Sequence, residues 1–137
     1  MKLLLDTNVV SRIIRGREPH VRERYRKAVD AGQTLWISSI VLHELRFGVL
    51  RSSDPGRNAE RLNDFLAELD AIEPFTPEDA ETAAEIRAGL ARLGMMIGPF
   101  DLLIAAHARR LDATIVTGNV REFSRVPGLQ WVDWTTP

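Results

Sequence analysis

The spacing of apolar residues along the chain predicts alternating strands and helices. The opening run of three leucines indicates a buried strand over residues 2–6, because it is too short for a signal sequence or a membrane span. Runs of apolar and β-branched residues between turn signals predict four further strands. These strands are expected at residues 34–38, 71–75, 113–117 and 129–134.

Helical periodicity fills the segments between these strands. Helices are expected at residues 8–15, from Pro19 to near Gly32, at 39–51, at 58–70, from Pro77 onward, and from Pro99 to near Asp112. The Asp-Pro-Gly signal within 52–58 predicts a loop. Strand–helix alternation is typical of an α/β fold with a parallel sheet and helices on both faces. With 137 residues, the chain is expected to form one domain over residues 1–137.

Three acidic residues stand out at element ends or on apolar seams. Asp6 follows the first strand, where it is either a helix cap or a functional carboxylate. Glu44 has only apolar side chains or glycine three and four positions away, so an intrahelical ion pair is not available to it. Asp101 lies in the first turn of a helix, with Ile104 and Ala105 ahead of it. A partner arginine for Glu44, and the helix dipole for Asp101, are the structural alternatives.

Carboxylates gathered from separate segments repel one another unless a cation lies between them. Oxygen ligands select hard ions such as Mg²⁺ or Mn²⁺, and Mg²⁺ keeps several waters when it binds phosphates. This chemistry favours hydrolysis of a phosphate ester by a metal-activated water.

Composition changes the picture in two ways. The chain has no cysteine, which excludes disulfides and thiolate metal sites and fits a cytoplasmic location without a membrane segment. The net charge is only −1, but residues 11–30 hold seven basic and three acidic residues, a net of +4. Residues 54–85 hold ten acidic and two basic residues, a net of −8. Arginines of the basic segment are candidates for phosphate contacts, or for a solvated helix face with pairs such as Glu23 and Lys27.

Several other site types are excluded or weakened by missing residues. The sequence has neither a GxxxxGK[ST] loop nor a GxGxxG motif, and HEL at 43–45 lacks the second histidine of HExxH. A phosphorylated signalling domain also places an aspartate at a strand end, but neither Lys2 nor Lys27 lies near a late strand. His107, among alanines on a predicted helix, is interpreted as a packing residue.

Four segments occur in an order that resembles the PIN-domain ribonucleases, and most closely the VapC toxins of bacterial toxin–antitoxin pairs. They are LLLDTNV, SSIVLHEL, GPFDLLIAAHA and IVTGNVREF, and the resemblance extends from Lys2 to about Trp134. It implies a three-layer α/β domain with a five-stranded parallel sheet flanked by helices. It also implies an endoribonuclease that depends on Mg²⁺ or Mn²⁺, with Asp6, Glu44 and Asp101 as catalytic metal ligands.

One position departs from the family pattern. Many PIN domains carry a fourth acid after the fourth strand, where this sequence has Asn119. Asn119 is retained as a catalytic residue that orients water, and one bound metal rather than two becomes plausible. Glu122 is a nearby substitute for this acid, but it is expected to face solvent. Asn8 and Thr117 are expected to hold waters or the Asp6 carboxylate.

The resemblance also implies a context. A homodimer and a cognate VapB-type antitoxin are expected, together with an RNA substrate for which a tRNA anticodon loop is the first hypothesis. Arg12, Arg15 and Arg17 are the predicted RNA contacts. The alternative is a catalytically silent PIN module that binds RNA or protein, which the neutral Asn119 keeps open.

Overall fold

The computed structural model describes residues 1–137 and alternates strands with helices. The five strands are β1 (Lys2–Leu5), β2 (Thr34–Ser38), β3 (Ala71–Glu73), β4 (Thr114–Val116) and β5 (Gln130–Val132). The seven helices are α1 (Thr7–Arg15), α2 (Pro19–Asp30), α3 (Ser39–Arg51), α4 (Pro55–Glu68), α5 (Pro77–Arg92), α6 (Pro99–Leu111) and α7 (Val120–Phe123). Every predicted strand is present, and α7 is an additional short helix. None of the helices has the length and apolar character needed to span a membrane.

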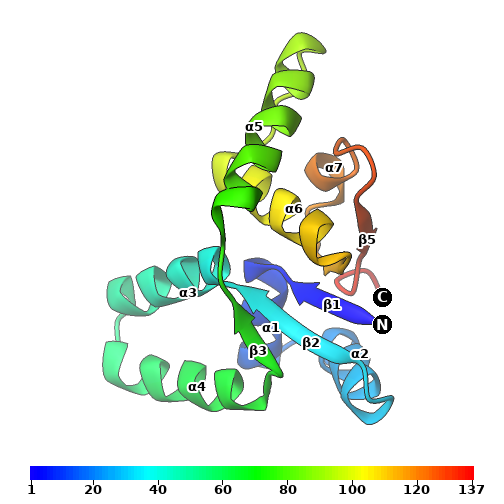
Figure 1. Cartoon of the computed structure of the whole chain (residues 1–137). Helices are drawn as coiled ribbons and strands as arrows, with labels where there is room; N and C mark the ends of the chain where they lie inside the picture. Colours follow the sequence, from blue (N-terminus) through cyan, green and yellow to red (C-terminus); the bar gives the residue numbers. More distant parts are fainter.

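The five strands form one parallel sheet in the order β3-β2-β1-β4-β5. The chain moves outward from β1 to β3 and then crosses back to the other side of β1 at β4. Because parallel crossovers are right-handed, the two directions of travel put α1–α4 and α5–α7 on opposite faces of the sheet (Figure 1). The direction reverses between β1 and β4. In open α/β sheets this switch point, beyond the carboxyl ends of the strands, is where ligands bind.

The central strand explains the opening apolar run. Leu4 and Leu5 of β1 are fully buried, as are Ile37 of β2 and Ile115 of β4. Helices on both faces remove these residues from water, so the strand has no alternation of apolar and polar positions. The sheet therefore forms a rigid base for the residues that follow β1 and β4.

Several strands are shorter than predicted, and two of the wrong boundaries have a clear local reason. The helix expected at 58–70 begins at Pro55, because Asp54 Oδ1 accepts a hydrogen bond from the Arg57 N–H at 3.2 Å and caps the first turn. The predicted loop is thus limited to residues 52–54. Strand β3 ends at Glu73 rather than at residue 75, because Pro74 has no N–H to donate to a neighbouring strand.

The C-terminal segment packs against α2. Thr135 O lies 2.8 Å from His20 Nε2, and Arg24 Nη1 donates to Asp133 O at 2.7 Å. Thr135 also comes so close to Gly118 that a Cβ there would lie 2.9 Å from its hydroxyl oxygen. Both chain ends lie on the same side of the molecule (Figure 1). Part of the basic segment 11–30 is therefore committed to holding the C-terminus.

Candidate active site

Asp6 is both a helix cap and a buried carboxylate at the switch point. Its Oδ1 accepts from the Thr7 N–H at 2.8 Å, and its Oδ2 accepts from Thr117 Oγ1 at 2.7 Å and from Asn8 Nδ2 at 3.4 Å. The residue is only 3% exposed. Burial raises the pKa of Asp6 above its usual value, against the hydrogen bonds from Thr117 and Thr7, and the Glu44 charge raises it further. The two readings of Asp6 from sequence are therefore compatible.

Glu44 has a hydrogen-bond partner that its own helix does not supply. Thr7 Oγ1, at the start of α1, donates to Glu44 Oε1 at 2.7 Å. The sequence prediction that no residue within α3 pairs with Glu44 is confirmed, and no arginine forms an ion pair with it. One residue thus connects two carboxylates, because the Thr7 backbone N–H is bound to Asp6 and its hydroxyl to Glu44.

Asp101 belongs to a second group of polar side chains, together with Asn119 and Glu122. Asn119 Nδ2 donates to Asp101 Oδ2 at 2.8 Å and to Glu122 Oε2 at 2.7 Å. The Gly98 N–H donates to Glu122 Oε1 at 3.1 Å, which fixes this carboxylate beside the start of α6. The expectation that Glu122 faces solvent was wrong. The short helix α7 turns its side chain back toward Asp101.

The charges of this group are shared unequally. Burial raises the pKa of Asp101 to about 8, and the neighbouring carboxylates of Glu122 and Asp6 contribute to the same shift. Hydrogen bonding with Asp101 holds the pKa of Glu122 below its usual value, with help from Asn119 and the Gly98 N–H. At neutral pH and without a cation, Asp101 therefore keeps its proton while Glu122 is ionised.

An entirely polar cleft of about 470 Å³ joins these residues. It brings together the four predicted catalytic residues and has no apolar side chain in its lining. Its lining residues are Asp6, Thr7, Asn8, Ser11, Arg12, Arg15, Glu44, Asp101 and Asn119. Three carboxylates from β1, α3 and α6 thus face one solvent-accessible space, with two arginines of α1 on its rim.

The predicted RNA contacts divide into two groups. Arg12 and Arg15 line the cleft, and Arg12 Nη1 is paired with Glu18 Oε1 at 2.8 Å on the surface. Arg17 is exposed and is not part of the cleft lining. Arg22 Nη2 donates to Ile13 O at 3.0 Å, which gives this arginine a structural role. The basic residues that line the cleft therefore both come from α1.

Comparison with known proteins agrees with this geometry. The family model of the PIN domain matches residues 3–129. The chain belongs to the PIN-domain family. It is 40% identical over 135 residues to the tRNA(fMet)-specific endonuclease VapC of Shigella flexneri, across 98% of this chain and 99% of that relative.

Two solved structures resemble this PIN domain over nearly its whole length. The crystal structure of VapBC2 from Rickettsia felis bound to a DNA fragment from their promoter has a TM-score of 0.90 at 36% identity, across 98% of this chain and 99% of that one. DNA-bound VapBC from Salmonella typhimurium has a TM-score of 0.88 at 37% identity, across 98% of both chains. Within the PIN family, the chain groups with the VapC proteins.

The donor set of this PIN domain suits a hard divalent cation. All the acidic side chains offer oxygen, and a cation would favour the ionised form of Asp101, whose pKa is raised chiefly by burial and further by the carboxylates of Glu122 and Asp6. No three Asp, Glu or His side chains lie close enough together to form a compact cluster. Mg²⁺ does not require one, because it binds through one or two carboxylates and retains water. The residues present therefore fit a magnesium or manganese ion.

Sequence reasoning missed two residues of the site. Thr7 is not among the predicted site residues, and Glu122 is predicted to face solvent. The sequence carried a partial signal for Glu122, because it is the acid nearest to the neutral Asn119. For Thr7 there was none, since its bond to Glu44 spans 37 residues. Asn8 and Thr117 occupy the predicted places, each donating a hydrogen bond to Asp6.

Thr7→Val should reduce the rate of RNA cleavage about tenfold, a loss typical of residues that orient metal ligands. Valine keeps the shape of threonine but removes the hydroxyl that holds Glu44 Oε1. Thr7→Ser keeps the hydroxyl and should retain most of the activity. Initial rates at saturating RNA test the pair. Equal rates for the two variants would show that the hydroxyl does not position Glu44.

Proposed function

We propose that the protein is a metal-dependent endoribonuclease and the toxin of a type II toxin–antitoxin pair, with initiator tRNA as its substrate. The observation that carries this proposal is the polar cleft with Asp6, Glu44 and Asp101 at the switch point of the sheet. The likeness to tRNA(fMet)-specific endonucleases supports the choice of RNA.

The reaction we propose is attack of water on a backbone phosphorus, with cleavage of the bond from phosphorus to O3′. A divalent cation, when bound, lowers the pKa of the attacking water and offsets negative charge on the phosphate. The chain's own residues hold the ligands in place. Asp6 is fixed by Thr7 and Thr117, and Glu44 is fixed by Thr7. Arg12 and Arg15 on the rim are placed to contact the flanking phosphates.

Glu122 bears on the missing fourth acid, whose position is occupied by the neutral Asn119. The side-chain amide of Asn119 adds no charge, but it donates to both Asp101 and Glu122. A further carboxylate beside Asp101 therefore comes from Glu122, three residues later, although Glu122 does not line the cleft. This arrangement disfavours the alternative of a silent PIN module, because that alternative rested on the missing fourth acid.

A VapB-type antitoxin and a second copy of this chain are the proposed protein partners. VapBC complexes are the subject of the similar solved structures, which supports the antitoxin. An antitoxin that places a basic side chain in the cleft would pair with the crowded carboxylates. We place the protein in the cytoplasm, where its tRNA substrate is found.

Incubation of the purified toxin with pooled tRNA in Mg²⁺, in Mn²⁺ and in EDTA tests the proposed function. We expect one tRNA species to be cut at one or a few sites in the anticodon loop, with both ions and not in EDTA. Elongator methionine tRNA is the matched control for initiator tRNA. Intact RNA under all conditions, with RNA still bound, would instead support the silent module.

A further inference from the structure

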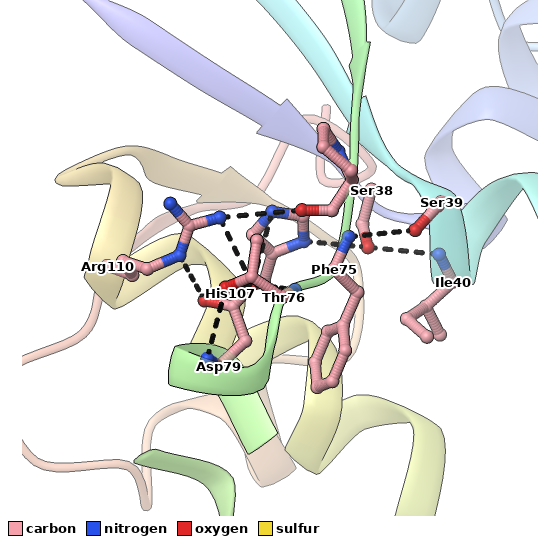
Figure 2. A network of polar contacts seen from close by, with 9 residues as sticks. Ser38, Ser39, Ile40, Phe75, Thr76, Asp79, His107 and Arg110 are labelled. Atoms are coloured by element: carbon pink, nitrogen blue, oxygen red, sulfur yellow. Dashed lines mark hydrogen bonds and ion pairs between the residues drawn. The ribbon is translucent and has the colours of Figure 1, made fainter. Parts of the chain in front are cut away.

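A second group of buried polar side chains lies where β2, α5 and α6 meet (Figure 2). The side chains of Ser38, Asp79 and His107 are all fully buried. His107 Nδ1 lies 2.9 Å from Ser38 Oγ. The predicted packing role of His107 is therefore only part of its function, because a buried imidazole bonded across 69 residues connects two separate elements.

The hydrogen bonds assign the protons of this pair. Ser38 Oγ already accepts from the Ile40 N–H at 3.0 Å, as the cap of α3. Its single hydroxyl proton is then free to be donated to His107 Nδ1. Burial lowers the pKa of His107, which favours the neutral ring. The carboxylate of Asp79 beside Nε2 favours the tautomer with its proton on that nitrogen, so that Nδ1 accepts from Ser38. Nε2 faces Asp79 Oδ2 at 3.7 Å and has no closer partner.

Asp79 is itself held rigidly, so it fixes the far side of the ring. Arg110 Nε donates to its Oδ1 and Arg110 Nη2 to its Oδ2, while the Thr76 N–H donates to Oδ2 at 2.8 Å. Burial opposes the charge, but the hydrogen bonds from Arg110 and Thr76 outweigh it and lower the pKa of Asp79. The edge of Phe75 also packs on the imidazole, with the ring centroids 5.9 Å apart. His107 is thus confined on each side.

The two ends of the Ser38–His107 bond lie at the helices that carry the proposed catalytic acids, because Ser38 ends β2 and caps α3, and His107 is part of α6. Glu44 lies six residues after Ser38 on α3, and Asp101 lies six residues before His107 on α6. Six residues of helix span about 9 Å, so a small rotation at the bond changes the separation of the two carboxylates. The bond is the polar link between the start of α3 and the body of α6.

We propose that His107 is a positioning residue, which sets the distance between Glu44 and Asp101 through its hydrogen bond to Ser38. This inference rests on the proposed function, because it concerns the same acidic cleft. It assigns no contact between His107 and RNA or metal. The ring acts only through the placement of α3 against α6.

Two substitutions separate positioning from simple packing. His107→Leu fills the space but removes the hydrogen bond, whereas His107→Asn leaves a cavity but keeps a polar atom near the position of Nδ1. We expect the leucine variant to have a higher melting temperature than the asparagine variant. It should nevertheless lose about 10- to 100-fold in kcat, with KM for RNA unchanged. The asparagine variant should melt lower and retain most of the kcat. Activity and stability should therefore rank in opposite orders.

Binding of Mn²⁺ followed by electron paramagnetic resonance gives a readout that does not depend on cleavage. We expect the affinity to be about tenfold weaker in His107→Leu and near the wild-type value in His107→Asn. If wild type binds Mn²⁺ but cuts no RNA, the proposed function fails while this comparison still tests His107. Tyr25→Phe is the control, because Tyr25 is buried against Phe65, away from both the cleft and this bond.

Wild-type kcat and Mn²⁺ affinity in His107→Leu would overturn the proposal. The proposal would also be overturned if the variant with the lower melting temperature were the one with the lower kcat. If His107→Leu does not fold, Ser38→Gly removes the same bond from its other end, and glycine is a tolerated helix cap, so α3 loses little stability. This variant must show the same loss of kcat at unchanged KM.

Discussion

Asp6→Asn should abolish RNA cleavage without destabilising the fold. We expect a loss of at least about a hundredfold in kcat/KM, which corresponds to about 2.7 kcal/mol of transition-state stabilisation. The reason is that asparagine keeps the shape of aspartate but not its charge, so a cation at the cleft loses its most buried ligand. Cleavage of initiator tRNA in Mg²⁺ measures this loss.

The fold should tolerate this change because asparagine is also a good helix cap. Its oxygen can still accept from the Thr7 N–H, and burial no longer opposes a charge. Thermal unfolding in EDTA at pH 7 should therefore give a melting temperature equal to or above that of wild type. A clear fall would mean that the carboxylate is chiefly structural.

Asp112→Asn is the matched control for Asp6→Asn. Asp112 ends α6 in the left-handed region, with φ 52°, and asparagine adopts this conformation readily. It is exposed and lies outside the cleft. We expect unchanged cleavage. An equal loss of cleavage activity in Asp6→Asn and Asp112→Asn would show that Asp6 has no specific role in cleavage.

Without metal, the stability of the protein should fall as the pH rises from about 6.5 to about 8. The folded-state pKa of Asp101 is raised from 3.8 to about 8, so the folded protein holds a proton that the unfolded chain releases. Such a group stabilises at low pH, and its contribution is lost as the pH rises through the folded value. The raised pKa of Asp6 acts in the same direction.

His107 and Glu122 also have shifted pKa values, and only His107 affects stability near the lower end of this pH range. The lowered pKa of His107 makes stability rise with pH up to about 6.5, which opposes Asp101 there. The lowered pKa of Glu122 affects only the region below its usual value of 4.5. The fall in stability with rising pH is therefore clearest above pH 6.5.

Melting temperatures in EDTA across pH 6.5 to 8 measure this slope. We expect Asp101→Asn to remove most of it, because the amide has no proton to lose. Added Mg²⁺ should flatten it in wild type, since the cation favours the ionised carboxylate. The same slope in wild type and variant would show that Asp101 does not hold the proton.

Two of the proposed catalytic acids could be selected from the sequence because each breaks a local rule. Glu44 has no partner within its own helix, and Asp6 ends a strand that is otherwise apolar. Their proximity follows from topology, since Asp6 follows β1, Glu44 lies on the helix after β2, and these two strands are neighbours in the sheet. Glu122 could not be placed in this way. Its side chain is turned inward by a four-residue helix and by the Gly98 N–H, and neither leaves a periodic pattern.

Charge composition predicted a basic segment but not the role of each arginine. Arg12 and Arg15 reach the cleft, whereas Arg22 and Arg24 donate to backbone carbonyls elsewhere in the fold. These residues have the same chemistry and similar spacing. The packing of α2 separates them: Arg22 is held by the carbonyl of Ile13 on α1, and Arg24 by the carbonyl of Asp133 in the C-terminal segment.

The ends of the RNA fragments test the central claim most directly. Wild-type protein is incubated with initiator tRNA and Mg²⁺, and the cleaved ends are identified by enzymatic labelling and mass spectrometry. Attack by water with departure of O3′ predicts a 5′-phosphate on one fragment and a 3′-hydroxyl on the other. A 2′,3′-cyclic phosphate with a 5′-hydroxyl would show that the ribose itself attacks, and would contradict hydrolysis by a metal-activated water at the acidic cleft.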